Sequence, residues 1–359
     1  MPVEPPVNTP RTLGYRMPAE WEPHEATWLA WPHNREDWPG KFQPIPWVFA
    51  EIVRLLARRE RVHILVQDEK SERRARGILK RAGTDLGSVS FHPWATDRVW
   101  TRDSGPIFVR NASGQVAVTN WRFNAWAKYD DWHRDDEIPA RVSAFLGLPE
   151  WQPAVQLADG SRRLVLEGGS IDTNGEGTLL TTEECLLSEV QQRNPGVSRA
   201  QLEYAFSDYL GINQVIWLNR GVVGDDTHGH VDDVARFVGP RMMIAAVEPD
   251  ARDPNHEPLA ENLARLKRAH TPEGRPFEVV ELPMPRPVVF RRQRLPASYA
   301  NFYIANGLVL APTFHDPNDR VALNILANVF PDREVIGIHS VDLIWGLGAL
   351  HCMTQQQPA

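Results

Sequence analysis

The alternation of apolar and polar positions predicts a chain in which strands and helices recur in one fixed order. Two short apolar runs joined by a turn are followed by an amphipathic helix and then by a third apolar run. Three consecutive units show this order clearly. Their two strands, helix and closing strand are predicted at residues 164–172, 178–181, 198–210 and 214–218, then 232–238, 242–247, 257–270 and 277–282, then 299–304, 308–312, 318–329 and 334–338.

Two weaker copies of this unit precede the three clear ones. Their predicted elements are strands 107–110 and 115–121 with helix 139–146, and strand 28–31, helix 47–59 and strand 62–66 with an additional helix 69–82 and strand 89–94. Units that recur roughly every 65 residues indicate a closed, propeller-like α/β ring rather than a doubly wound sheet. We therefore expect a single domain over residues 1–359, with a Pro-rich segment 1–12 at its periphery.

Composition and charge narrow the class of partner. The 359 residues include 39 basic and 46 acidic side chains, for a net charge of −7, without runs of Lys or Arg. Such a chain is a poor binder of polyanions, so we expect neither nucleic acid nor a membrane surface as its partner. No apolar stretch approaches the roughly 18 residues of a membrane span and no leader pattern is present, so the expected location is the cytoplasm. A homo-oligomer remains open.

The two cysteines invite different interpretations. They are too few for a disulfide framework, and no CxxC or HExxH spacing offers a metal site. Cys352 follows Gly346 and Gly348, which permit close backbone approach of a substrate, so it is a candidate nucleophile, with an inert buried thiol as the alternative. Cys185 precedes two leucines and has no histidine near it in sequence, so we expect it only to pack.

A short acidic segment, 224–233, contains four carboxylates and two imidazoles. On a strand, His230 and Asp232 would share one face, which suits a catalytic histidine beside a substrate-binding aspartate. A metal site with His228 and His230 as ligands and a solvated acidic turn are the alternatives.

Two further carboxylates stand in segments that favour function. Asp103 lies in a tight polar turn, 100–106, that we expect to end a strand, although an Arg102–Asp103 surface pair is the ordinary alternative. Glu167 precedes two glycines and follows an apolar run, where burial of its charge is costly without a cationic partner. One thiol, one imidazole and three carboxylates suit a planar guanidinium, which carboxylates grip bidentately.

Several longer segments resemble the agmatine deiminase family (agmatine iminohydrolases), whose close relatives include bacterial peptidylarginine deiminases. The segments that carry the resemblance are 17–28 (MPAEWEPHEATW), 100–106 (WTRDSGP), 167–172 (EGGSID), 229–232 (GHVD), 301–307 (NFYIANG) and 351–358 (HCMTQQQP). The resemblance implies a pentein-type fold, a five-bladed α/β propeller. It also implies Cys352 as nucleophile, His230 as general acid and base, Asp103 and Asp232 as guanidinium ligands, and Glu167 as a supporting residue.

The implied reaction is hydrolysis of agmatine to N-carbamoylputrescine and ammonia, a step of putrescine and polyamine biosynthesis, with no metal or organic cofactor. His228, Leu347 and Ala349 depart from the pattern expected of agmatine deiminases. Protein-arginine deimination therefore stays open as an alternative, as do a papain-type Cys-His amide hydrolase and a catalytically inactive cation-binding or assembly protein of the same fold.

Recognition of the substrate's tail is a separate question. The distal amine of agmatine needs a second anionic group, for which Asp226 is the candidate, with Asp97 behind it. Trp100 is the candidate wall for the methylene chain or a cation–π partner.

Overall fold

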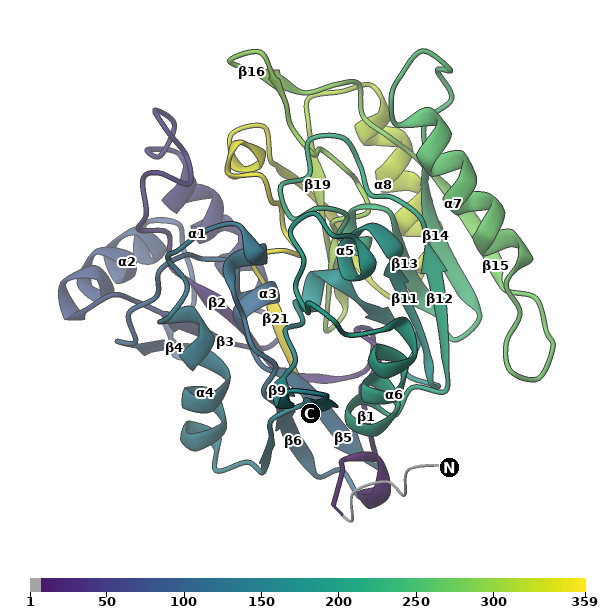
Figure 1. Cartoon of the computed structure of the whole chain (residues 1–359). Helices are drawn as coiled ribbons and strands as arrows, with labels where there is room; N and C mark the ends of the chain where they lie inside the picture. The colour runs from purple at the N-terminus through teal and green to yellow at the C-terminus, as the bar shows by residue number, and fades with distance from the viewer. Residues whose placement is uncertain (1–7) are drawn as a thin grey trace.

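The computed structural model describes residues 8–359, so most of the Pro-rich segment expected at the periphery lies outside the described residues. The described part contains five mixed sheets of three or four strands and two small two-stranded ribbons (Figure 1). The five larger sheets share one order of elements, which the next paragraphs follow.

Three sheets in the second half of the chain have three strands each. In each sheet the first two strands are antiparallel neighbours, and a helix then crosses over to a third strand that runs parallel to the second. Their elements are β10 (Asp172–Thr173), β11 (Thr178–Thr182), α6 (Arg199–Leu210) and β12 (Gln214–Leu218); β13 (Ala235–Gly239), β14 (Met242–Val247), α7 (His256–Arg268) and β15 (Glu278–Pro283); β18 (Tyr303–Ala305), β19 (Leu308–Thr313), α8 (Asn318–Val329) and β20 (Glu334–His339).

The sheet before these has the same order with an extra strand at its edge. The antiparallel pair is again followed by a helix and a parallel strand, and β1 joins the free side of the first strand. Its elements are β1 (Tyr15–Arg16), β5 (Ile107–Asn111), β6 (Val116–Thr119), α4 (Ile138–Leu146) and β7 (Glu150–Trp151).

The fifth sheet joins segments from opposite ends of the described chain. β21 pairs antiparallel with β2, and two successive helical crossovers then add two parallel strands. Its elements are β21 (Gln355–Pro358), β2 (His24–Ala30), α1 (Ile45–Leu56), β3 (Arg61–Leu65), α2 (Glu69–Arg81) and β4 (Val89–His92). The first strand of this sheet therefore comes from residues more than 300 positions after the second.

The remaining elements are short. The ribbons are β8 (Ala154–Leu157) with β9 (Gly160–Arg163), and β16 (Val289–Phe290) with β17 (Gln293–Arg294). The short helical turns are η1 (Arg11–Leu13), η2 (Leu86–Ser88), α3 (Thr101–Ser104), η3 (Ala125–Ala127), η4 (Asp135–Glu137), η5 (Gly168–Ser170), α5 (Glu183–Leu187), η6 (Val231–Asp233) and η7 (Leu343–Gly346).

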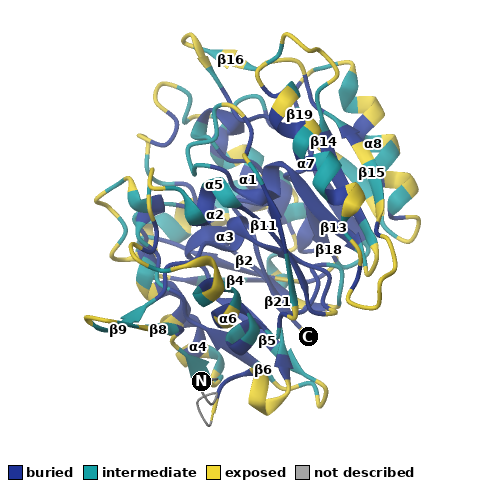
Figure 2. Cartoon of the chain, turned by 45° about the vertical axis from the view of Figure 1, so that its right-hand side comes forward, coloured by how far each residue is buried: buried dark blue, intermediate teal, exposed yellow. Residues whose placement is uncertain are grey.

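Local chemistry accounts for the helices and the central strands. A capping box opens α6, where the Ser198 side chain accepts from the Gln201 backbone and the Gln201 side chain accepts from the Ser198 backbone. The strand β18 is buried along its whole length and β19 along all but its last residue, which explains their nearly continuous apolar character. Figure 2 shows this division, with buried strands at the centre and exposed helix faces and loops outside.

The first strand of several units begins later than the sequence predicts. The expected strand 232–238 starts only at Ala235, the expected strand 164–172 is reduced to β10, and the expected strand 299–304 starts at Tyr303. The residues before each of these strands form tight turns instead, because their polar side chains bond to the backbone and to one another across the units. His230 therefore directly precedes a 3-10 turn, Asp232 lies within that turn, and the two do not share a strand face as predicted.

No helix among residues 8–359 combines the length and the apolar character that a membrane crossing requires.

Candidate active site

Five turns, one from each of the larger sheets, bring polar side chains to one region. Each turn directly precedes the first strand of its sheet: α3 before β5, η5 before β10, η6 before β13, residues 298–301 before β18, and residues 351–354 before β21. The segment around Asp103 therefore leads into a strand and does not end one as expected. The side chains that these turns carry are Asp103, Glu167, His230 with Asp232, Asn301 and Cys352.

The Cys352 thiol is buried and held by two neighbours. The Asn301 amide donates to Sγ at 3.1 Å, and the Asp232 carboxylate lies 3.8 Å from Sγ. Burial, together with the nearby carboxylates of Asp232, Asp233 and Asp103, raises the pKa of Cys352 well above its usual value. The thiol is therefore protonated at neutral pH until a positive charge arrives.

Asp232 is oriented by a buried relay. His351 bonds through Nδ1 to Oδ2 of Asp232 and through Nε2 to Oε2 of Glu20, both at 2.7 Å. Burial alone would raise the pKa of the Asp232 carboxyl, but the hydrogen bond from His351 holds it below its usual value. Glu20 is itself fixed by Arg236 at 2.8 Å, so the orientation of Asp232 depends on residues from the first segment of the described chain.

Asp103 faces the same space from the other side. Its oxygens accept from the Trp126 indole at 2.9 Å and from the Gly169 backbone at 3.1 Å. Burial raises the pKa of Asp103 to about 6, although the positive charge of His230 opposes the rise. A side chain at position 169 would lie 2.6 Å from Nδ1 of His230 and 2.8 Å from Oδ1 of Asp103, so the site requires glycine there.

His230 lies between two carboxylates. Its Nδ1 is 3.7 Å from Asp103 and its Nε2 is 3.8 Å from Glu167, both beyond hydrogen-bond distance. Burial would lower the pKa of His230, but Asp103, the Cys185 thiol and Glu167 raise it well above its usual value. The imidazole is therefore positively charged at neutral pH.

The cationic partner expected for Glu167 is Arg193. The two side chains are fully buried and pair at 3.0 Å between Nε and Oε1. Burial would raise the pKa of Glu167, but Arg193 and His230 lower it to about 2. Glu167 is therefore a permanent carboxylate beside His230.

Four buried polar atoms in this cluster have no hydrogen-bond partner among the described residues. They are Oδ1 of Asp232, Oε2 of Glu167, and both ring nitrogens of His230. Buried polar atoms are rarely left unpaired in folded proteins. The cluster therefore has free acceptors for the N–H groups of a planar cation and a free proton donor beside them.

Cys185 packs in a buried apolar cluster, as its sequence context predicts, and it also lies beside two polar side chains. Its Sγ, a carboxylate oxygen of Glu167 and a ring nitrogen of His230 all lie within 4.8 Å of one another. Sequence reasoning missed this proximity because His230 is 45 positions away in sequence and comes close only through the packing of β11 against η6. His228, the other histidine considered as a metal ligand, instead bonds to Ser188 at 3.1 Å.

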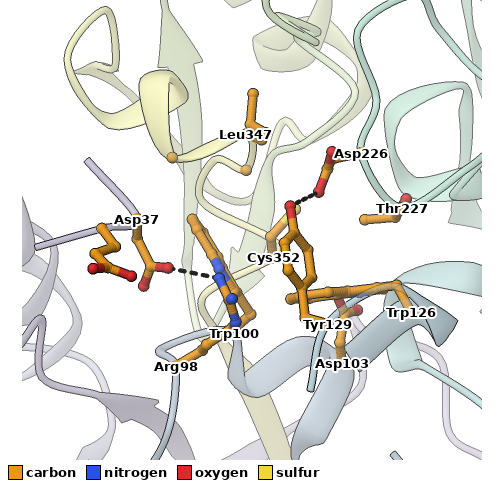
Figure 3. Close-up of a pocket in the computed structure, with 13 residues that line it drawn as sticks. Asp37, Arg98, Trp100, Asp103, Trp126, Tyr129, Asp226, Thr227, Leu347 and Cys352 are labelled. Atoms are coloured by element: carbon orange, nitrogen blue, oxygen red, sulfur yellow. Dashed lines mark hydrogen bonds and ion pairs between the residues drawn. The ribbon is translucent and has the colours of Figure 1, made fainter. Parts of the chain in front are cut away.

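A pocket with about 510 Å³ of empty volume leads to Cys352 (Figure 3). Asp103 and Cys352 lie at its inner end, and its walls include Trp100, Trp126 and Tyr129. Trp126 is placed by three consecutive residues, 125–127, in the left-handed backbone region, which side chains rarely adopt. The indole is thereby turned onto Asp103.

The two glycines before Cys352 make room for two tryptophans. A side chain at Gly348 would meet the Trp100 ring at 2.7 Å, and one at Gly346 would meet Trp38 at 2.6 Å. Both glycines line the pocket, but it is two tryptophans that need their missing side chains. Leu347 between them has a left-handed backbone, with φ 68°, and also lines the pocket.

At the outer end of the pocket, the two aspartates expected to bind the distal amine of the substrate already have other partners. Asp226 lines the pocket, but its carboxylate is already paired with Lys128 and accepts from the Tyr129 hydroxyl at 2.6 Å (Figure 3). Asp97 is not among the lining residues and bonds to the Arg134 backbone at 2.9 Å. Glu36 lines the pocket with an exposed carboxylate that forms no ion pair within residues 8–359.

Sequence reasoning assigned no role to four residues of this region, namely Asn301, His351, Arg193 and Glu20. Asn301, His351 and Glu20 lie in segments that carry the family resemblance, and this is the signal that could have revealed them. Arg193 lies outside those segments and acts through its contact with Glu167, so it had no such signal.

Comparison with known proteins agrees with this geometry. Residues 16–358 match the family described as Porphyromonas-type peptidyl-arginine deiminase. Agmatine deiminases of Pseudomonas aeruginosa and Stutzerimonas stutzeri are each 37% identical to the chain, with 99% and 98% of the chain and 98% of each relative covered. The solved structure of an agmatine deiminase of Enterococcus faecalis superposes with a TM-score of 0.88 at 31% identity, covering 99% of both chains.

Proposed function

The chain belongs to the Porphyromonas-type peptidyl-arginine deiminase family together with its agmatine deiminase relatives, and we propose that it hydrolyses agmatine to N-carbamoylputrescine and ammonia. The observation that carries the proposal is the buried cluster in which the Cys352 thiol lies 3.8 Å from Asp232 while oxygens of Asp232 and Glu167 and both ring nitrogens of His230 have no hydrogen-bond partner among the described residues. A papain-type hydrolase would need oxyanion donors around the thiol, whereas carboxylates surround this one.

Asp103 and Asp232 hold the guanidinium. Oδ1 of Asp232 is free to accept N–H groups, while its Oδ2 is kept in place by His351. The arriving positive charge offsets the carboxylates that raise the pKa of Cys352, so substrate binding itself favours the thiolate. The thiol proton is released to solvent in this step.

The thiolate then attacks the guanidinium carbon and forms a C–S bond. The His230 imidazolium protonates one nitrogen of the tetrahedral adduct, and ammonia leaves, which yields a cationic amidino-thioether on Cys352. Glu167 keeps the imidazole beside the leaving nitrogen and stabilises its positive charge before the transfer.

Hydrolysis regenerates the thiol. Neutral His230 takes a proton from a water molecule, the resulting hydroxide adds to the same carbon, and the C–S bond breaks. The departing thiolate takes up the remaining proton, and a ureido product leaves. His230 thus acts as acid in the first half of the reaction and as base in the second.

Glu36 is our candidate for the distal amine of agmatine. The charge of Asp226, the residue predicted from the sequence, is already compensated by Lys128, whereas the Glu36 carboxylate, which lines the same pocket, forms no ion pair with any residue of the described chain. Trp100 and Trp126 would enclose the methylene chain between the two ends. Free arginine would bring its own carboxylate to the end of the pocket where Glu36 lies, and the two like charges would repel each other.

Protein-arginine deimination is the second candidate, favoured by the description of the matching family. A ureido-product assay with agmatine, free arginine and a peptidyl-arginine substrate separates the two. We expect kcat/KM for agmatine to exceed the others by at least about a hundredfold, roughly 2.7 kcal/mol. Cys352→Ala serves as the control without a nucleophile. Equal turnover of the peptide would replace the agmatine assignment, and full activity of Cys352→Ala would end the covalent mechanism.

We further propose that the five sheets are the blades of one closed ring and that residues 1–359 form a single deiminase domain. The repeated order of elements and the pairing of β21 with β2 support this arrangement. Such a ring should unfold in one cooperative transition, which calorimetry would test.

The expected cytoplasmic location and the absence of nucleic-acid and membrane partners stay predictions from the sequence.

A further inference from the structure

The cluster of Glu167, Cys185 and His230 contains more ligating chemistry than the proposed reaction uses. The reaction needs the imidazole and its carboxylate, but it assigns no step to the Cys185 thiol. All three side chains are buried, and their potential ligand atoms lie within 4.8 Å of one another. Thiolate, imidazole and carboxylate are the donors that Zn²⁺ and other thiophilic divalent cations prefer.

The backbone holds these donors in a fixed arrangement. Thr182 caps α5 by accepting from the Cys185 backbone at 3.0 Å, and the same hydroxyl donates to the carbonyl of Gly229, the residue before His230. The turn that carries the thiol is thereby tied to the turn that carries the imidazole. Tetrahedral ligands of zinc are roughly 3.3–3.8 Å apart, so only a small closure of the cluster is needed.

The unsatisfied atoms point to a ligand rather than to internal pairing. Oε2 of Glu167 and both His230 nitrogens have no hydrogen-bond partner in the described chain. Oε1 of Glu167 is occupied by Arg193, which leaves Oε2 as the free oxygen. On the opposite side of the ring, Asp103 lies 3.7 Å from Nδ1, where it can orient an imidazole that ligates through Nε2.

Charge within the cluster is compatible with a divalent cation. Arg193 opposes a metal, but Glu167, Asp103 and a Cys185 thiolate together balance the combined charge of Arg193 and the cation. Binding displaces the protons of Cys185 and His230, so the metal competes with protons for the site.

We propose that Glu167, Cys185 and His230 form a site for a thiophilic divalent cation, Zn²⁺ in the first instance, that reversibly inhibits the enzyme. The bound cation occupies the nitrogen lone pair that His230 needs as a base. It also displaces the proton that His230 donates as an acid. The inhibitory consequence rests on the proposed deiminase function, whereas the metal site itself does not.

Binding is tested with Cd²⁺ as the probe in the Cys352→Ala protein, where Cys185 is the only thiol. We expect thiolate-to-Cd²⁺ charge-transfer absorbance that saturates at one Cd²⁺ per chain. The absorbance should disappear in the Cys352→Ala/Cys185→Ser double variant, and Glu167→Gln should weaken binding at least tenfold. His228→Ala, which removes a nearby histidine outside the cluster, is the matched control and should bind as before, with thermal unfolding recorded for every variant.

Inhibition is tested on the wild-type enzyme with agmatine. Zn²⁺ should abolish turnover and a chelator should restore it, and Cys185→Ser should need at least tenfold more Zn²⁺ to lose half of its own activity. No Cd²⁺ signal in Cys352→Ala, or an unchanged signal in the folded double variant, would overturn the metal site. Binding with undiminished turnover would overturn the inhibition. If the metal-free wild type does not turn over agmatine, the proposed function fails, and the Cd²⁺ titration alone decides the site.

Discussion

The inner and outer ends of the pocket are built in different ways. At the inner end, Asp103, Asp232 and Cys352 stand on turns that lead directly into buried strands, and each is fixed by a specific neighbour. At the outer end, Glu36 and Asp226 stand on loops, and Glu36 is exposed to solvent. The inner end is a product of the repeated architecture, whereas the outer end depends on segments between the repeats.

This difference separates reaction from specificity. Buried charges without water around them must be held by partners, so the inner end tolerates little change. Exposed charges at the rim interact weakly, so the outer end can be altered without loss of the fold. We therefore expect substitutions to have graded effects that decrease from the inner end to the outer end.

The largest effect is expected for the two guanidinium ligands. Asp103→Asn and Asp232→Asn each replace a charge-assisted contact with a neutral one, and kcat/KM should fall by roughly 10²–10³-fold, about 3–4 kcal/mol. Steady-state kinetics with agmatine measures the loss. A decrease below about tenfold in both variants would show that the inner end does not hold the guanidinium.

A smaller loss is expected when the relay behind Asp232 is broken. His351→Gln removes the imidazole between Asp232 and Glu20 without touching the substrate, so kcat should fall by roughly 10–100-fold. Because His351 acts by orienting Asp232, the double variant His351→Gln/Asp232→Asn should be little worse than Asp232→Asn alone. Additive losses in that cycle would mean that His351 acts independently of Asp232.

The thiol at the inner end should show a distinctive dependence on pH. Because burial and the surrounding carboxylates raise the pKa of Cys352, the thiolate fraction at neutral pH is small and grows about tenfold per pH unit. Alkylation by neutral iodoacetamide, followed by mass spectrometry, should accelerate accordingly toward alkaline pH. A cationic haloacetamidine should react faster at pH 7 and depend less on pH. Rapid, pH-independent alkylation by iodoacetamide would contradict the protonated resting thiol.

The smallest effect is expected at the outer end. Glu36→Gln should lower kcat/KM for agmatine only severalfold, on the order of 1 kcal/mol, and should reduce the preference for agmatine over arginine. Asp226→Asn is the matched comparison, since its carboxylate is already paired with Lys128, and it should change the preference less. The opposite ranking of the two variants would return the amine-binding role to Asp226.

The elements of the fold could be predicted because their signals are local. The capping box at Ser198 and the apolar runs of β14 and β19 depend on neighbours within a few residues. The starts of the first strands were less predictable, since the turns that replace them are stabilised by contacts between units. Sequence could place Asp103, Glu167, His230, Asp232 and Cys352 in one site only through their motifs and the resemblance.

The sequence by itself determined the order of strands and helices, the residue types available for chemistry and the family resemblance. Tertiary structure alone decided the partners: His351 between Asp232 and Glu20, Arg193 against Glu167, and Cys185 beside His230. It also decided that Asp226 is neutralised by Lys128 while Glu36 forms no ion pair in the part of the chain that the structure describes. The physical reason is that the pKa and availability of a charged group depend on which charges lie within a few ångströms, and those neighbours come from distant positions in the chain.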